Sequence, residues 1–119
     1  MAKQSRFEKQ LNTLNQQMVQ MGSMVEQSIE MAVSALVTKD SEKAHNVIEY
    51  AADVSNQERQ IEGMCMKLLL CQQPVASDLR MISSALKMIT DMERIGDQAA
   101  DISELALCLV NEKELPMIF

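Results

Sequence analysis

Three acidic residues that recur every four positions are the strongest candidates for chemistry in this sequence. On a helix, Glu93, Asp97 and Asp101 would stack along one edge, about one turn apart. An E-x-x-x-D pair can hold one or two cations from the same side, and ligation by oxygen atoms alone suits magnesium, manganese or iron. We therefore predict a metal site at these three residues. The alternative interpretation is an ordinary acidic helix face in water.

Glu93 differs from the other two acids because it falls within an apolar stripe. Apolar or small residues recur at alternating intervals of four and three, with Glu93 as the one charged member: Val75, Leu79, Ile82, Leu86, Ile89, Gly96, Ala100, Ser103, Leu107 and Val110. A buried carboxylate must be paired, protonated or metal-bound, since desolvating it alone is costly. Glu58 occupies a similar position between Val54 and Ile61, so both carboxylates can face the same interior.

A basic row precedes the acidic edge. Arg80, Lys87 and Arg94 recur every seven residues, with Asp78 and Asp91 beside them. The simplest interpretation is a solvated face of salt bridges, because such pairs are common and weak. Alternatively, Arg94 holds the acidic edge in place, or Asp78 and Arg80 form a polar docking site with the free N–H groups of the first helical turn. We predict Asp78, Arg80 and Arg94 as partner-binding residues.

Three long helices must position these side chains. Ser5 and Glu8 form a capping box, Asp40 or Ser41 can cap the next helix, and Pro74 suits the first position of the last one. The predicted helices span about 6–37, 41–71 and 74–110. Connections this short force neighbouring helices to run up-down-up. The predicted fold is therefore all-α, an antiparallel three-helix bundle.

Composition excludes several classes of partner and compartment. A net charge of −6 argues against binding nucleic acid, which requires clustered lysine and arginine. The three cysteines show no C-x-x-C spacing and are expected to be reduced thiols of a cytoplasmic protein. The N-terminus has no apolar segment typical of a signal peptide, and the longest apolar run, Leu68 to Cys71, is far too short to span a bilayer. No direct membrane insertion is expected.

Several phrases of the sequence resemble one known family. QQPVASDLR followed by SALKMITDMERIGD closely resembles the PhoU family of phosphate transport regulatory proteins. MGSMVEQSIEMAVSAL and DSEKAHNVIE are similar to the same family, in the same order. The resemblance covers nearly the whole chain, from about Phe7 to Val110, and it implies that residues 1–119 form one three-helix repeat, similar to the first of the usual two.

The resemblance implies a function that composition alone does not. Members of the family are not enzymes. They are adaptors that link the ATP-binding subunit of a phosphate ABC transporter to a sensor histidine kinase, and they damp the phosphate-starvation response. Some bind iron or other metals through E/D-x-x-x-D motifs, which fall on Glu93 and Asp97 here, so iron, manganese or another divalent metal is the expected cofactor. A single repeat is expected to associate as a homodimer or larger species.

The chain also departs from the family pattern. Ala51 and Ser55 stand where the family usually has Asp and Asn, which weakens any contribution of the second helix to a metal site. A ferritin-like di-iron oxidase needs Glu-x-x-His pairs on two helices, and Glu42 with His45 supplies only one. Phosphotransfer on His45 would need a basic neighbour, whereas Glu42 and Glu49 flank it. The remaining alternatives are a structural interaction module or a metal-binding bundle without a phosphate role.

Overall fold

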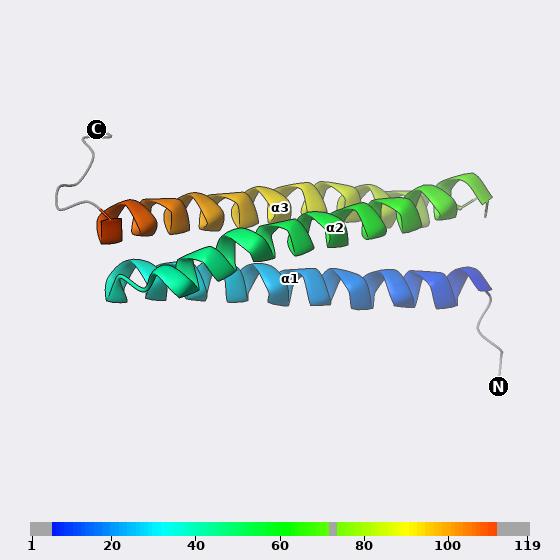
Figure 1. Cartoon of the computed structure of the whole chain (residues 1–119). Helices are drawn as coiled ribbons and strands as arrows, with labels where there is room; N and C mark the ends of the chain where they lie inside the picture. The colour runs from blue at the N-terminus through cyan, green and yellow to red at the C-terminus, as the bar shows by residue number, and fades with distance from the viewer. Residues whose placement is uncertain (1–5, 72–73, 112–119) are drawn as a thin grey trace.

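The chain folds into three long helices that lie side by side. The computed structural model describes residues 6–71 and 74–111, except for the side chains of Cys71 and Asn111. The helices are α1 (Arg6–Thr38), α2 (Ser41–Cys71) and α3 (Ala76–Asn111), and each packs against the other two. The molecule is a rod with extents of 64 × 29 × 16 Å, in which α1 begins and α3 ends at opposite ends (Figure 1). The predicted up-down-up bundle is confirmed.

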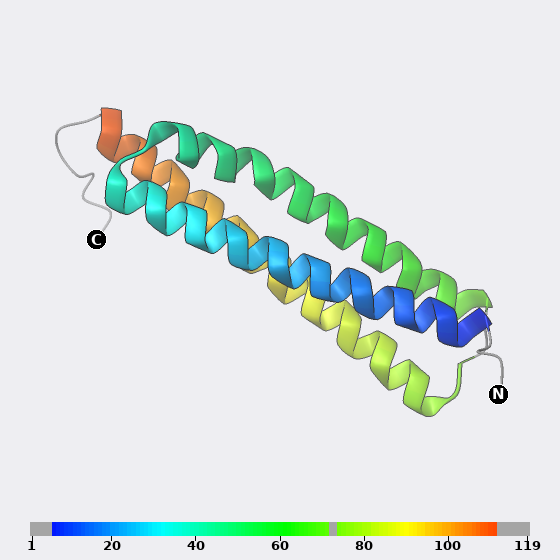
Figure 2. The same ribbon diagram turned by 90° about the horizontal axis from the view of Figure 1, so that it is seen from below.

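The core changes character along the rod. The half around the α2–α3 connection is filled by large side chains, among them Leu14, Met21, Ile61, Leu68, Ile82 and Ile89. In the half around the α1–α2 connection, most of the buried apolar residues are alanines, joined by Val47: Ala32, Ala35, Ala44, Ala99 and Ala106. Small side chains let helix backbones approach closely, so the same three helices pack in two ways. Figure 2 shows the same three helices from below, all running along the length of the rod.

The predicted apolar stripe of α3 is correct in its centre and wrong at its start. Ile82, Ile89 and Ser103 are almost completely buried, but Val75 is 64% exposed and Leu79 is 43% exposed. The helix begins at Ala76, two residues later than predicted, with the N–H of Leu79 donating to the Val75 carbonyl at 2.9 Å. Pro74 therefore precedes the helix instead of opening it. Alanines on the adjacent row complete the core: Ala85, Ala99 and Ala106.

The α1–α2 connection is a tight turn closed by backbone hydrogen bonds. Lys39 adopts a left-handed conformation with φ of 55°, and the N–H of Asp40 donates to the Ala35 carbonyl at 3.1 Å. This is the Schellman pattern that ends many helices. Asp40 then caps α2, as predicted, because its Oδ1 accepts from the Lys43 N–H at 3.2 Å. Ser5, the other half of the predicted capping box at α1, lies outside the described residues.

Gly96 sets the approach of α3 to α2. A Cβ at this position would lie 3.2 Å from Cγ1 of Val54, which is 1% exposed. A Cβ at Gly63, by contrast, would meet nothing within 4 Å. The two glycines occupy helix interiors for different reasons, since Gly96 is required by packing and Gly63 is not.

Replacing Lys39 with glycine is expected to stabilise the fold. Glycine adopts positive φ without the steric cost that a lysine Cβ imposes, so the free energy of unfolding should rise by about 0.5–1 kcal/mol. Urea unfolding followed by circular dichroism measures the change. Lys87→Gly, at an exposed position inside α3, is the matched control and should lower stability by about 1 kcal/mol. A destabilised Lys39→Gly protein would contradict the observed turn.

The two glycines should respond oppositely to alanine. Gly63→Ala should stabilise by up to about 1 kcal/mol through helix propensity. Gly96→Ala gains the same helix propensity, but its new Cβ presses against Val54, which is buried and β-branched. The free energy of unfolding should therefore fall by about 1 kcal/mol. Adding Val54→Ala to Gly96→Ala should remove the interaction and show coupling between the sites. Equal gains from both single substitutions would mean that α2 and α3 are not in close contact here.

Candidate functional site

The three predicted metal ligands do not converge. Glu93 is half-buried, whereas Asp97 and Asp101 are exposed. A spacing of four residues advances about 40° around a helix at each step, so the second and third acids turn progressively away from the position of the first. In the chain as described, no group of three or more His, Cys, Asp or Glu side chains could hold a metal ion. The residues of one chain therefore do not fit the metal site expected from sequence.

Glu93 instead meets Glu58 across the α2–α3 interface. Burial raises the pKa of Glu58 to about 7, together with a hydrogen bond to Glu93 and the negative charges of Glu93 and Glu62, while the Arg59 guanidinium opposes the shift. Two carboxyl groups can share a hydrogen bond only when one carries a proton. When Glu58 carries that proton, its carboxyl group is the donor and Glu93 the acceptor. Of the three fates open to a carboxylate in an apolar stripe, the raised pKa makes protonation of Glu58 easier than that of an ordinary glutamate.

A second polar pair lies beside the carboxyl pair. Gln57 is 7% exposed, and its Nε2 donates to Gln17 Oε1 at 2.6 Å and to the Gln17 carbonyl at 3.3 Å. Consecutive residues of α2 thus face different neighbours, Gln57 toward α1 and Glu58 toward α3. Together these four side chains form what we call the polar layer. It lies near the middle of the rod, within a turn of the close contact between Val54 and Gly96.

Sequence reasoning missed the glutamine half of the polar layer. Gln57 falls between Val54 and Ile61 in the apolar stripe of α2, which is the same signal that singled out Glu58. Gln17 carries the same signal between Leu14 and Met21 on α1, although its side chain is only half-buried. Its role follows from the backbone carbonyl and side-chain oxygen that it presents together to Gln57.

The predicted partner-binding residues are separated along α3. Asp78 is half-buried in the first turn, and Arg80 and Arg94 are exposed about four turns apart. The guanidinium whose charge acts on Glu58 is that of Arg59, which itself donates to Asn56 Oδ1 at 2.9 Å. The exposed arginines of α3 are thus available to other molecules.

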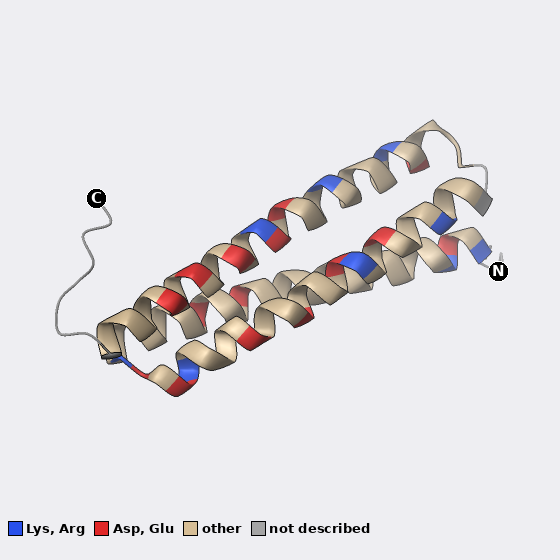
Figure 3. Cartoon of the chain, turned by 45° about the horizontal axis from the view of Figure 1, so that its top comes forward, with Lys and Arg blue, Asp and Glu red and all other residues tan. Residues whose placement is uncertain are grey.

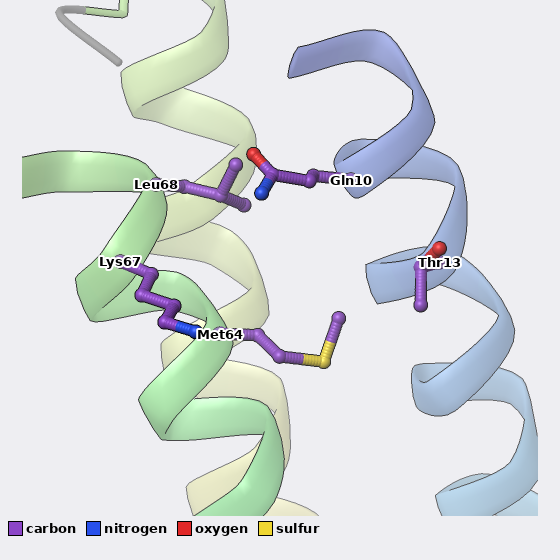
Figure 4. A pocket seen from close by; sticks show the side chains of 5 residues that line it. All are labelled: Gln10, Thr13, Met64, Lys67 and Leu68. Atoms are coloured by element: carbon purple, nitrogen blue, oxygen red, sulfur yellow. The ribbon is translucent and has the colours of Figure 1, made fainter. Parts of the chain in front are cut away.

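Among the described residues, hollows beside the bundle include one between α1 and α2 and one between α1 and α3. The smaller one, about 180 Å³, lies between α1 and α2 and is lined by Gln10, Thr13, Met64, Lys67 and Leu68 (Figure 4). Gln10 Oε1 is buried there without a hydrogen-bond partner in the described chain. This volume is below the roughly 300–1,000 Å³ typical of small-molecule sites. The larger one, about 340 Å³, is an apolar groove between α1 and α3 lined by Leu14, Asn15, Met18, Val19, Met81, Ser84, Ala85 and Met88.

Two cysteines are free thiols in contrasting surroundings. Cys65 is buried in the core. Burial raises the pKa of its thiol, and the negative charge of Glu62 raises it further. A raised pKa keeps the thiol protonated and unreactive. Cys108 is exposed near the end of α3. The sequence also predicts mostly buried thiols; Cys65 is buried, Cys108 is exposed, and the side chain of Cys71 lies outside the described residues.

The raised pKa of Glu58 predicts a specific pH dependence of stability. A carboxyl group with pKa near 7 when folded and 4.5 when unfolded stabilises the protein below pH 4.5, and this contribution is lost as pH rises through 7. Between these limits the free energy of unfolding should fall by about 1–2 kcal/mol, less than the full shift implies because Glu58 keeps some contact with water. Urea titrations at intervals of half a pH unit measure it.

Substitutions separate Glu58 from other titrating groups. The free energy of unfolding of Glu58→Gln should stay constant over the pH range in which that of the wild type falls. The amide can donate the same hydrogen bond as the protonated carboxyl group, and it does not titrate. Glu62→Gln, one turn away and exposed, should retain most of the decline. Parallel pH profiles for the wild type and Glu58→Gln would contradict the assignment of the shared proton.

Comparison with known proteins extends the geometric description. The family model described as the PhoU domain matches residues 18–106. Phosphate-specific transport system accessory protein PhoU of Escherichia coli (strain K12) is 36% identical over 112 residues, which are 94% of this chain and 46% of that protein. The PhoU homolog of Pseudomonas putida is 39% identical, over 92% of this chain and 43% of its own length. The chain spans about half the length of these relatives.

A solved structure agrees in both fold and sequence. The crystal structure of PhoU from Pseudomonas aeruginosa superposes with a TM-score of 0.88 at 38% identity, covering 93% of this chain and 53% of that one. Among the described residues, no helix is long and apolar enough to cross a membrane. The family model matches well over half of this chain, and the resemblance seen in its sequence is confirmed: the chain belongs to the PhoU family.

Proposed function

We propose that this chain acts as a non-enzymatic accessory regulator of phosphate transport. The observation that carries the proposal is similarity over 92–94% of the chain to proteins named as accessory proteins of the phosphate-specific transport system. In the proposal the chain works in the cytoplasm by contacting other proteins, as a homodimer or larger species. Its partners are the ATP-binding subunit of a phosphate ABC transporter and a phosphate-responsive sensor histidine kinase.

The surface of α3 supports a protein-contact role. Arg80, Lys87 and Arg94 are exposed at intervals of two turns, so they form a row of cations that a rigid helix holds at fixed spacing. Asp78 lies at the start of this row in the first turn of α3. Such a row can bind a partner surface whose carboxylates have a matching spacing. Positive charge spread evenly over a surface would not select for that spacing.

A metal ion is not part of the proposal. Glu93 lies against Glu58, Asp97 and Asp101 are exposed, and among the described residues no group of three or more His, Cys, Asp or Glu side chains could hold a metal ion. The four side chains of the polar layer instead hold the helices in register. The outer surface of α3 stays exposed beside this layer and is available for recognition.

Removing the two arginines of the row should weaken transporter contact without unfolding the bundle. The experiment captures the transporter's ATP-binding subunit on the immobilised chain and measures Kd. Arg80→Ala with Arg94→Ala should weaken binding at least 10-fold, since each loses a charged contact worth about 1 kcal/mol or more. Lys9→Ala with Lys67→Ala removes the same charge from α1 and α2 and is the matched control.

A physiological readout tests the role itself. In cells that lack their own accessory protein, expression of the chain should lower a phosphate-starvation reporter under phosphate-replete conditions, and the arginine double variant should not. A chain that binds the ATP-binding subunit but leaves the reporter unchanged would be an interaction module without a regulatory role. Failure of the wild-type chain in both assays would refute the proposal.

A further inference from the structure

The cavity between α1 and α2 contains a polar atom without a partner. Its volume is about 180 Å³, and it is lined by Gln10, Thr13, Met64, Lys67 and Leu68. The side-chain oxygen Oε1 of Gln10 is buried there and accepts no hydrogen bond from the described residues. Figure 4 shows the Gln10 carboxamide pointing from α1 toward Leu68 on α2. Because a buried acceptor left unpaired is costly, this cavity is suited to a molecule that donates a hydrogen bond.

The other polar groups of the cavity define the charge of that molecule. Within the described chain, Lys67 makes no hydrogen bond or ion pair, so its ammonium donors are available. The Thr13 hydroxyl donates its proton to the Lys9 carbonyl at 3.0 Å, so toward the cavity it acts as an acceptor. One cation and two acceptors therefore line the same space. A small anion that carries a proton on one of its oxygens satisfies all three groups.

Two further cations lie close to the cavity. Arg6 and Lys9 are exposed, and each precedes a lining residue of α1 by four positions, which places both on the same edge about one turn away. The acids nearest in sequence are Glu8 and Glu62, each two positions before a lining residue. A step of two residues turns to the opposite side of a helix, so neither acid faces the cavity. The immediate surroundings are thus positively charged.

Charge is also distributed unevenly along the whole rod. The half that contains the α1–α2 connection, residues 20–58 and 92–111, carries eleven acids and three bases, a net charge of −8. The other half, residues 6–19, 59–71 and 74–91, carries four acids and six bases, a net charge of +2. Figure 3 shows acidic residues gathered toward the end where α1 joins α2. The cavity lies in the positive half, where an anion is repelled least.

We propose that this cavity binds a small oxyanion that keeps a proton, namely inorganic phosphate, a choice within the class that rests on the proposed function. At neutral pH every form of phosphate carries a hydroxyl group. That hydroxyl donates to Gln10 Oε1, and the charged oxygens accept from Lys67. At about 30 Å³ per water molecule, the cavity has room for about six waters, which suits an inorganic ion and excludes a nucleotide.

Sulfate is the comparison that isolates the role of Gln10. It matches phosphate in shape and in negative charge, but it carries no proton at neutral pH. Bound in the same way, sulfate would place an oxygen against Gln10 Oε1, so that two acceptors face each other without a hydrogen atom between them. A site built around one hydrogen bond rejects an analogue that lacks it, because its buried polar group is left unpaired.

NMR titrations of the full chain with inorganic phosphate and with sulfate test the site. The side-chain amide signals of Gln10 should shift and saturate with phosphate. The Kd for phosphate should be at least about 10-fold lower than that for sulfate, which is the effect of one hydrogen bond to a buried acceptor. Both titrations are run at matched ionic strength, because screening by salt weakens the attraction of any anion to the lysine.

Two variants separate the acceptor from the cation, read from the backbone amide of Leu68. Gln10→Met removes the acceptor, so the phosphate Kd should rise to that of sulfate while the sulfate Kd stays unchanged. Lys67→Met should weaken binding of both anions. Gln16→Met and Lys43→Met are the matched controls, since each changes an exposed residue of the same type on the same helix outside the cavity, and neither should alter either Kd. Circular dichroism verifies that the variants remain helical.

Three results would overturn the proposal. Without a saturable shift in the wild-type chain, only water fills the cavity. Equal affinities for phosphate and sulfate would mean general attraction to surface cations, and this comparison needs no variant. A preference for phosphate that persists in Gln10→Met would also contradict the site. These titrations contain no partner protein, so a chain that lowers the starvation reporter without binding phosphate would keep the proposed function and lose only this site.

Discussion

The close approach of α2 to α3 at the middle of the rod is the constraint on which the rest of this structure depends. Gly96 leaves room for Val54, and one turn away Glu58 lies half-buried against Glu93. Partial burial and the neighbouring Glu93 raise the pKa of Glu58 to about 7, so its charged form is less favourable there than in water. On the opposite side of α2, Gln57 and Gln17 complete the polar layer. Apolar stripes alone would allow the helices to pack in several registers. Sliding one helix along another would leave the polar groups without partners, so the other registers are less stable.

Sequence was sufficient for the helices because their signals are local and redundant. Apolar residues at alternating intervals of three and four, the cap at Asp40 and the break before Ala76 locate three helices to within two residues. Short connections then leave one simple topology. The exposed start of α3 was missed because periodicity identifies an apolar face but does not say where along the helix its neighbours end. Val75 and Leu79 continue the stripe beyond the part that α1 and α2 cover.

The candidate site could be only partly predicted, for a geometric reason. The position of Glu58 and Glu93 within apolar stripes correctly marked both as unusual, but sequence does not reveal which buried groups meet across an interface. Extending Glu93 to Asp97 and Asp101 treated a spacing of four as a straight line, whereas a helix rotates about 40° over each such step. Asp97 and Asp101 consequently lie in water, where acids need no partner. Charge asymmetry along the rod becomes visible only once the antiparallel fold places distant segments at the same end.

Direct titration of Glu58 tests the central claim most simply. Carboxyl carbon chemical shifts of glutamate, measured by NMR from pH 3 to 9 and assigned with Glu58→Gln, report the proton on that side chain itself. The midpoint for Glu58 is expected near 7, and it should move down when Glu93→Gln removes the neighbouring charge. A wild-type midpoint near the ordinary value of 4.5 would contradict it. In that case Glu58 is ionised in the folded protein, and no shared proton links α2 to α3.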